Sequence, residues 1–545
     1  MALAYGSFHE LSHQLRFLLF EMGVALSQQQ IDYYLTLAHR SYLKELQQAA
    51  INEGYLSSPL ISHHIHDFLE QLRIHLKRTL PESRFFTWDK LVQQSSETVA
   101  NMAMALAYKK CWQRSLGKEL AGHPTMWHWI EQQNKQSSYL FLEQWACLHQ
   151  ALRPSLKNTR TYTRREVLQY SAEFQAQYSI HWAALRKSTT LADSSPLMAK
   201  EFPQEYASWQ QKVSLHHLDA SQYQPIPIHP WVWRNHLQAH CIGLMDNKSL
   251  ILLPHQQKVR PTISLDLVMP LNSATLLKLA PEKDGAVENI LHSLLVHEQN
   301  YNHTLFLSSK PLTVQLKTAF SPQTSVGFSL IQSPNALNAG EQTIPLLSLF
   351  APSPLSSNLL IDDLIEKSGL NPLVYFSHYC TKILHGPLHL LLKHSLSFAV
   401  QAEHMALSIS KQLPQGLILR DLDHLTMKHR INLEKKEVRN KESDLNQDLR
   451  KEFLTTMLQN NIYFWVEHLH LKYQIEKQGL WRQVRQSLSY LFSKLNKDLP
   501  TSYLTEQYIK LINEPWQSRA HLSYLLKPID REPVYVKKDN PMANL

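Results

Sequence analysis

The stretch Ile226-Pro227-Ile228-His229-Pro230-Trp231 lies near the middle of the chain and is the natural starting point for its fold. Prolines on both sides of the histidine restrict the backbone, so the imidazole is held at a defined angle. A rigid histidine beside a tryptophan can orient an anionic substrate. The alternative interpretation is a loop histidine that packs against Trp231 and Trp233. His229 is therefore a candidate substrate-binding residue.

Short apolar runs around this stretch predict strands. They lie between clusters of Pro, Asn and Ser at residues 249–253, 263–269, 304–307 and 312–316. Helical patterns over residues 166–187 and 287–297 are mixed with them. We therefore expect the central part of the chain to be α+β.

Helical patterns dominate on both sides of this central part. Apolar residues recur three and four apart from residue 8 to about residue 111. A Pro/Ser-rich stretch begins at Ala351, and long helices are predicted beyond it over residues 388–413 and 453–478, with a strand at 416–420 between them. We predict an α+β chain with a helical N-terminal lobe (1–115), a central mixed sheet-and-helix lobe (116–345) and a largely helical C-terminal lobe (346–545) enclosing a cleft.

Composition excludes several classes of protein. Of the 545 residues, 43% are hydrophobic and 19% charged, as in ordinary globular enzymes. The four cysteines form no CxxC pair, and the N-terminus has the pattern of a helix and not of a signal peptide, so we expect a cytoplasmic protein. The net charge of +9 is scattered and no apolar run could span a membrane, so we expect neither nucleic acid nor membrane as a partner. The 30 histidines lack metal-ligand spacing, which argues against a metal-storage protein.

Glycine is scarce, with 13 residues in the whole chain, and neither GxxxxGK[ST] nor GxGxxG occurs. A main chain that approaches a pyrophosphate closely needs residues without a Cβ. If the protein binds a nucleotide, side chains must hold it.

Five short polar sequence motifs follow one another along the chain. They are Gly122-His123-Pro124, Ile228-His229-Pro230-Trp231, Pro261-Thr262-Ile263-Ser264, Lys278-Leu279 and Leu419-Arg420-Asp421. Together they resemble the NRPS-independent siderophore synthetases of the aerobactin-synthetase (IucA/IucC) family. The resemblance implies an ATP-dependent ligase that condenses a polycarboxylic acid such as citrate with an amine or alcohol through an acyl-adenylate. It also implies Mg²⁺ as a cofactor, a role in iron acquisition, and a possible homodimer.

The resemblance assigns roles to individual residues. It implies nucleotide contacts from Ser264, Lys278, Arg420 and Asp421, with Lys278 and Arg420 as catalytic cations and Asp421 and Asp423 as Mg²⁺ ligands. The alternative for Lys278 is a surface lysine at a strand end. Substrate binding falls to His123, His229, Glu403 and His404, the last two on an expected helix.

The chain also departs from the family pattern. Where the family has an arginine and a threonine after the serine, this chain has Asp266 and Leu267. Later family positions for Glu, Gln and Asn are Gln401, Met405 and Ala406. A carboxylate in place of an arginine repels a triphosphate unless a metal lies between them. These changes leave open a catalytically silent relative that binds a small polyanion or a synthetase partner.

Overall fold

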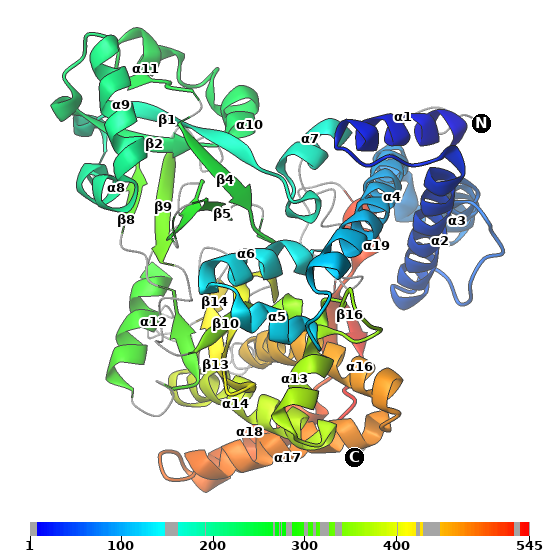
Figure 1. Ribbon diagram of the computed structural model, residues 1–545. Coiled ribbons are helices and arrows are strands. Elements are labelled where there is room, and N and C mark those ends of the chain that lie inside the picture. The colour runs from blue at the N-terminus through cyan, green and yellow to red at the C-terminus, as the bar shows by residue number, and fades with distance from the viewer. Residues whose placement is uncertain are drawn as a thin grey trace.

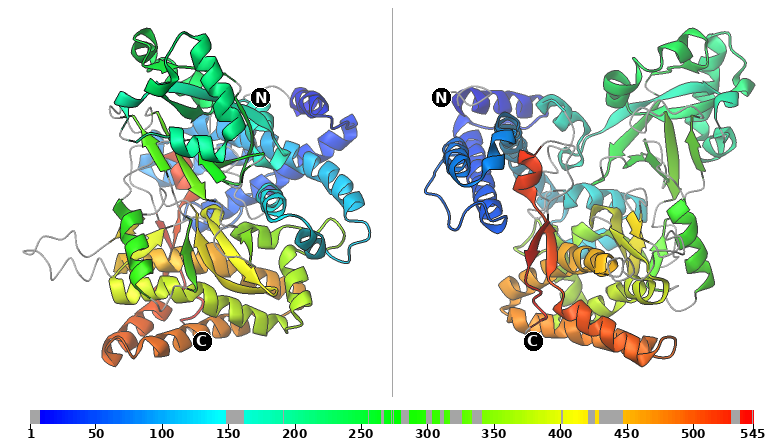
Figure 2. Two further views of the ribbon diagram at one scale, coloured as in Figure 1. Left: turned by 60° about the vertical axis from the view of Figure 1, so that its left-hand side comes forward. Right: turned by 180° about the vertical axis from the view of Figure 1, so that it is seen from behind.

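A computed structural model shows how the chain is arranged (Figures 1 and 2). The residues that it describes are 8–147, 162–190, 192–254, 256–264, 267–271, 273, 275–279, 286–298, 303–308, 312–316, 326–332, 341–399, 402–420, 426–428, 447–527, 535–543 and 545. Asp266, Gln401, Asp421 and Asp423 lie outside these residues.

The N-terminal part is built of helices around one apolar core. The helices are α1 (Phe8–Glu21), α2 (Gln28–Asn52), α3 (Ile65–Thr79) and α4 (Trp88–Glu119), with a short 3₁₀ turn at Pro81–Phe85. Each helix buries one apolar stripe in the shared core. Ser27 begins α2 with a capping box, in which its side chain accepts from the Gln30 N–H and the Gln30 side chain accepts from the Ser27 N–H.

Helix α6 contacts both β-sheets of the molecule, a large one and a small one. It lies between the two sheets in Figure 1. Tyr139 and Leu140 of α6 pack on the large sheet, whereas Ser138 accepts a hydrogen bond of 3.2 Å from Gln342 on the small sheet. The helices of this region are α5 (Met126–Gln132), α6 (Lys135–Ala146) and α7 (Arg164–Tyr170), followed by a 3₁₀ turn at Ala172–Phe174.

The large sheet is antiparallel throughout, with the order β2-β1-β4-β5-β6-β9-β8 and β3 paired to β1. Its strands are β1 (Tyr178–Arg186), β2 (Tyr223–Ile228), β3 (Leu250–Ile251), β4 (Gln257–Pro261), β5 (Leu267–Pro270), β6 (Thr275–Lys278), β8 (Leu312–Gln315) and β9 (Gly327–Gln332). Alternate side chains point to opposite faces. One face packs with α8 (Ser195–Glu201) and α9 (Pro203–Leu215), and the other packs with α6. Short helices at α10 (Pro230–Val232), Trp233–Leu237 and α11 (Ile242–Asp246) lie between β2 and β3, and 3₁₀ turns occupy Lys187–Thr189 and Ala220–Gln222.

The small sheet has the order β10-β12-β13-β7 and packs against a long helix. Its elements are β7 (Leu305–Leu307), β10 (Gln342–Pro345), β12 (Met405–Ser410), β13 (Leu413–Leu419), α12 (Ala286–His297), a 3₁₀ turn at Leu346–Phe350, α13 (Leu360–Ser368) and α14 (Pro372–His394). Gly386 of α14 lies so close to β7 that a Cβ there would be 2.6 Å from the Leu305 Cβ. Residue 386 therefore has to be a glycine for α14 to lie this close to the sheet.

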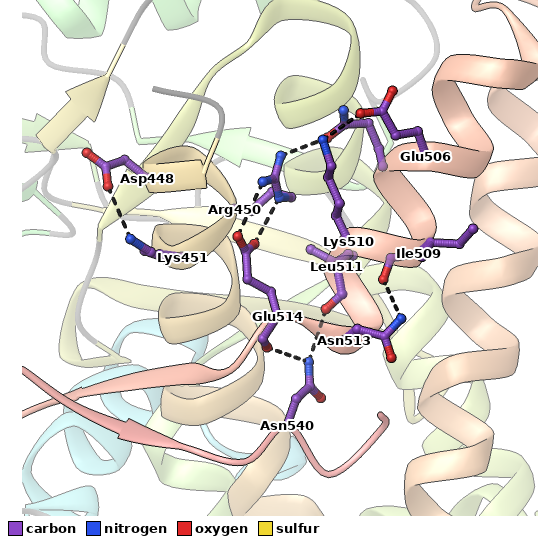
Figure 3. A network of polar contacts seen from close by, with 11 residues as sticks. Asp448, Arg450, Lys451, Glu506, Ile509, Lys510, Leu511, Asn513, Glu514 and Asn540 are labelled. Carbon is purple, nitrogen blue, oxygen red and sulfur yellow. Dashed lines mark hydrogen bonds and ion pairs between the residues drawn. The ribbon is translucent and has the colours of Figure 1, made fainter. Parts of the chain in front are cut away.

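The C-terminal part is helical and ends in a two-stranded ribbon. Its elements are β11 (Ser397–Ala399), a 3₁₀ turn at Ala402–His404, β14 (Thr426–Lys428), a π-helix (Leu454–Ile462), α16 (Tyr463–Tyr473), α17 (Lys477–Leu495), α18 (Thr501–Asn513), β15 (Trp516–Arg519), α19 (His521–Leu526) and β16 (Tyr535–Lys538). A buried polar network holds this region together (Figure 3). Arg450 donates to both carboxylate oxygens of Glu514, at 2.9 and 3.3 Å, and Asn540 donates to the Leu511 and Glu514 carbonyls, both at 3.0 Å.

The structure confirms the α+β fold class, and it corrects two predicted helices. The predicted helix 166–187 stops at Tyr170, and β1 occupies most of its second half. The predicted helix 388–413 stops at His394, because Ser395 takes a left-handed conformation with φ of 51° and strands follow it. A short apolar run alone does not distinguish a buried strand from a helix. Among the described residues, no helix has both the length and the apolarity needed to cross a bilayer. The lobe boundaries stay a prediction.

Candidate functional site

Arg420, at the end of β13, lies at the point where α6 meets both sheets. Its side chain is fully buried. The guanidinium donates to the Tyr139 hydroxyl at 2.7 Å, to the Glu143 carboxylate and to the backbone carbonyl of Glu403. Both acidic and phenolic partners come from α6, so this one side chain joins α6 to the small sheet.

The partners of Arg420 explain why its guanidinium stays charged although it is buried. Burial by itself lowers the pKa of Arg420, but the Glu143 carboxylate and the Tyr139 hydroxyl outweigh this effect and leave the pKa above its ordinary value. Burial likewise raises the pKa of Tyr139, so its hydroxyl stays protonated at neutral pH. A buried charge is stable only when it is paired and hydrogen-bonded. Arg420 meets this condition through α6.

Ser264 lies in the buried turn between β4 and β5, next to this ion pair. The neighbouring Ile263 N–H donates to the Glu143 Oε2 at 3.2 Å. The turn is also closed from within, because the Thr262 hydroxyl donates to the Ser264 carbonyl at 3.1 Å and the Leu267 N–H donates to the same carbonyl at 3.2 Å. Glu143 therefore links the turn that carries Ser264 to Arg420.

Lys278 ends β6 and is buried, with an exposed fraction of 2%. The position at a strand end was predicted, but the surface location was not borne out. Lys278 lies opposite Leu267 on β5 and Ser329 on β9. Leu267 and Leu276 pack with Tyr139, so the alternation of side chains puts Lys278 on the face of the sheet that α6 covers. It shares this face with the elements around Arg420.

Glu403 and His404 also lie beside Arg420. The Glu403 carbonyl accepts from the guanidinium, and the His404 carbonyl accepts from the Arg420 N–H at 3.0 Å. The predicted helix at this position is wrong: residues 402–404 form a 3₁₀ turn, and Met405 and Ala406 begin β12. Pairing of β12 with β13 brings residues 403 and 404 to residue 420.

His229 and His123 come from elements other than those that meet at Arg420. His229 is at the end of β2, the edge strand, which is three inter-strand spacings of about 4.8 Å from β5. Its Nδ1 accepts from the Trp231 N–H at 3.1 Å, and its ring contacts those of Tyr170 and Tyr178. His123 lies in the connection between α4 and α5, with its ring 5.8 Å from that of His128. The substrate roles of both histidines stay predictions.

Tyr139 and Glu143 were not predicted from the sequence. The signal that could have shown them is the segment Tyr139-Leu-Phe-Leu-Glu143-Gln-Trp-Ala, where a carboxylate interrupts an apolar helix. A carboxylate in such a position needs a buried cation as its partner. The predicted Mg²⁺ ligands Asp421 and Asp423, and the substituted Asp266 and Gln401, lie outside the described residues.

Comparison with known proteins finds two family models that match segments of this chain, and both segments contribute residues to this site. The model of the IucA / IucC family matches residues 138–281. The model described as "Ferric iron reductase FhuF-like transporter" matches residues 374–531. The first segment contains Tyr139, Glu143, Ser264 and Lys278, and the second contains Arg420. The Arg420–Glu143 ion pair therefore joins the two matched segments.

Two curated proteins are similar to part of the chain. A citryl-spermidine/3,4-dihydroxybenzoyl-citryl-spermidine:spermidine ligase of Bacillus anthracis is 22% identical over 317 residues, which are 52% of this chain and 51% of that protein. Putrebactin synthase of Shewanella sp. (strain MR-4) is 20% identical over 295 residues, 47% of this chain and 46% of that protein. The aligned part of the chain thus spans about half the length of the curated relatives it matches.

Solved structures show the same fold over most of the chain. The petrobactin biosynthesis protein AsbB of Bacillus anthracis str. Sterne superposes with a TM-score of 0.66 at 16% identity, covering 84% of this chain and 79% of that one. ATP-bound aerobactin synthetase IucA of Klebsiella pneumoniae superposes with a TM-score of 0.65 at 15% identity, covering 89% and 87%.

Proposed function

We propose that this chain, which is a divergent member of the IucA/IucC family of NRPS-independent siderophore synthetases, is itself an ATP-dependent ligase. In this proposal it joins a polycarboxylic acid of the citrate type to an amine or alcohol during siderophore biosynthesis. The curated relatives are named as a spermidine ligase and a putrebactin synthase, which supports the reaction class.

The observation that carries the proposal is the meeting of two matched segments around one ion pair. Glu143 accepts from the Ile263 N–H, next to Ser264, and from Arg420, and Arg420 in turn donates to the Glu403 carbonyl. Lys278 lies on the same face of the sheet. Polar residues that converge from separate elements are typical of a built site.

The residues present suit a nucleotide held by side chains. A buried lysine and a serine in a closed turn offer a point charge and a hydroxyl to phosphate oxygens. We infer that Lys278 and Ser264 contact the nucleotide. Arg420 is committed to Glu143 and Tyr139, so in this proposal it positions the Ser264 turn. Asp421 and Asp423 would supply the hard oxygen ligands that Mg²⁺ prefers.

The reaction proceeds in two displacements. The carboxylate of the acid attacks the α-phosphate of ATP, and pyrophosphate leaves. The amine or alcohol then attacks the acyl carbon, and AMP leaves. In both steps the protein has to neutralise crowded anions and align the attacking atom. In this proposal, the buried Lys278 ammonium neutralises part of the negative charge of the phosphates.

A hydroxylamine trap tests the ligase. Purified protein with ATP, Mg²⁺ and a panel of di- and tricarboxylates should yield an acyl-hydroxamate and an equal amount of pyrophosphate. Replacing Lys278 with Met should lower the rate by about 10² or more, because a preorganised charge on the reacting phosphate is lost. The matched control is Lys258→Met, an exposed lysine of the same sheet, which should leave the rate unchanged.

The competing function is a silent relative that binds a small polyanion. Two observations favour it: the guanidinium of Arg420 is occupied by Glu143, and Asp266 stands where the family pattern has an arginine. In that case the trap yields neither hydroxamate nor pyrophosphate with any acid, although calorimetry still detects nucleotide binding. That result would reject the ligase and retain the silent relative.

We place the protein in the cytoplasm, with small-molecule substrates and no nucleic-acid partner. A homodimer is expected, and light scattering on the eluting peak of a size-exclusion column measures it. A mass near 63 kDa would contradict the dimer.

A further inference from the structure

A second cluster of polar side chains lies between α12 and α14 and shares no residue with the Arg420 group. Glu298 follows the end of α12, and His389 and His394 belong to the last turns of α14. Their ligand atoms all lie within 4.8 Å of one another. The Glu298 carboxylate is 3.7 Å from the His389 Nε2 and 3.3 Å from the His394 Nε2. Among the described residues this is the one such group of three.

These spacings are close to those of a metal centre. A tetrahedral zinc ion with bonds of about 2.0 Å separates its ligand atoms by about 3.3 Å. The distance from the Glu298 Oε1 to the His394 Nε2, 3.3 Å, matches this spacing. The distance from the Glu298 Oε2 to the His389 Nε2, 3.7 Å, is slightly longer, so a bound ion requires a small contraction of the cluster. Two imidazoles and one carboxylate are also a ligand set that borderline divalent metals prefer.

The protonation states suit the same role. Burial lowers the pKa of His389 to about 4, so its imidazole is neutral at pH 7 and keeps a lone pair for a metal. Burial raises the pKa of Glu298, but Lys393 and the neighbouring histidines outweigh this and lower it overall. Glu298 is therefore an ionised carboxylate at neutral pH.

Lys393 competes for the same carboxylate. Its ammonium lies 3.0 Å from each oxygen of Glu298. An ion that binds Glu298 has to displace the ammonium from at least one oxygen, and two cations at one carboxylate repel each other. The lysine thus lowers the affinity of the cluster for a metal without removing a ligand.

We propose that Glu298, His389 and His394 form a binding site for a divalent transition metal of the zinc class, with Lys393 as an internal competitor. The site is separate from the Mg²⁺ expected with ATP, which needs hard oxygen ligands. A bound metal ion would link Glu298, which follows α12, to the last turns of α14. Helix α14 packs against β7 at Gly386, and β7 pairs with β13, the strand that leads to Arg420.

The test is a zinc titration of the untagged full-length protein, followed by calorimetry and by thermal unfolding. We expect one tight equivalent and a rise in melting temperature. Glu298→Gln and His394→Gln should each weaken that equivalent at least tenfold and abolish the thermal shift. Lys393→Met should act in the opposite direction and tighten binding several-fold, because the competing ammonium is gone.

Two controls separate this site from surface histidines. His378→Gln changes another histidine of α14, whose Nε2 lies 3.0 Å from the Pro414 carbonyl, and should leave the tight equivalent intact. The triple change of His63, His64 and His66 to Gln should also leave it intact. The proposal is wrong if wild type binds no tight equivalent, if the equivalent survives Glu298→Gln and His394→Gln, or if it disappears in the triple variant.

A further comparison separates the site from a purely structural ion pair. If Glu298 serves only to bind Lys393, then Lys393→Met lowers the melting temperature and does not tighten zinc binding. That outcome overturns the proposal. It leaves the ligase assignment untouched, because the hydroxylamine trap is run without zinc.

Discussion

Arg420 and Glu143 form an ion pair in which both side chains are fully buried. Desolvation of two charges costs several kcal/mol, and mutual attraction offsets it only if other hydrogen bonds satisfy the remaining atoms. Tyr139, the Glu403 carbonyl and the Ile263 N–H provide such bonds, whereas the Arg420 Nε has no hydrogen-bond partner among the described residues. Such a pair contributes less to net stability than to fixing one arrangement of α6 and the two sheets.

We predict that Glu143→Gln lowers the free energy of unfolding by about 3–5 kcal/mol, because the Arg420 charge stays buried without its counterion. Urea denaturation measures this. The double variant Glu143→Leu with Arg420→Met should recover most of the loss, since it buries no charge. Equal losses in the single and double variants would show that the charge is not the cause.

Asp362 provides a pH-dependent contribution at the scale of one residue. Burial raises its pKa, but hydrogen bonds from His468 at 2.7 Å, the Leu359 N–H at 2.8 Å and Tyr473 at 3.0 Å outweigh burial and hold the pKa below its ordinary value. The folded state therefore binds fewer protons than the unfolded chain at acid pH. Its contribution is complete above the unfolded pKa of about 3.9 and disappears as the pH falls through the folded value.

We expect Asp362→Asn to reduce the loss of stability between pH 5 and pH 3. Urea midpoints at a series of pH values measure it, and the exposed Asp498→Asn is the control. If wild type and Asp362→Asn lose stability in parallel over this range, Asp362 is not the source of the pH dependence.

At the scale of elements, the ends of the helices decided most of the differences from the predicted structure. Helix α14 ends at His394, and the apolar residues beyond it enter strands, of which β12 pairs with the distant β10 as well as with its neighbour β13. Pairing between β12 and β13 brings Glu403 and His404 to Arg420. A local pattern contains no information on a distant partner such as β10.

The C-terminal elements depend on one buried arginine. Figure 3 shows Arg450 directed at Glu514 of the segment after α18, while Lys510 and Glu506 pair at the surface. We predict that Arg450→Ala costs about 3 kcal/mol of unfolding free energy, because the largely buried Glu514 is left without its cation. Chemical denaturation followed by circular dichroism measures it. Lys510→Ala is the matched control and should give no measurable change, since exposed pairs contribute little.

At the scale of the whole molecule, helix α19 from the C-terminal part of the sequence packs among the N-terminal helices. Helix α19 lies beside α2 and α4 in Figure 1. Leu522 and Leu526 are buried among the N-terminal helices. The Glu53 carboxylate accepts from the Leu522 and Ser523 N–H groups at 2.7 and 2.6 Å. The N-terminal helices thus have a core completed by residues more than 400 positions away.

We predict that Leu526→Ala destabilises the N-terminal helices by about 2–5 kcal/mol, the usual cost of a large-to-small change in a core. Hydrogen exchange of α2 and α4 measures it locally. Tyr524→Ala, an exposed residue on the same helix, should change exchange little. Uniform loss of protection across the molecule, including α17, would indicate global unfolding and contradict a local effect.

The sequence by itself was enough to predict the fold class, the helical N- and C-terminal parts and the strands around the central polar motifs. It was also enough to predict the family. Periodicity and short motifs depend on neighbouring residues, so they can be recognised without a structure. Ser264, Lys278, Glu403, His404 and Arg420 were all selected from such motifs. Their mutual arrangement was not predictable.

Only the tertiary structure decided what Arg420 does and which histidines lie together. The partner of Arg420 is Glu143, 277 residues earlier, and Glu298 meets His389 and His394 across two helices. The first group forms because burial makes an unpaired charge costly, so the packing of the core brings the fully buried Arg420 and Glu143 to one another. That cost depends on the whole fold, and no local pattern in the chain expresses it.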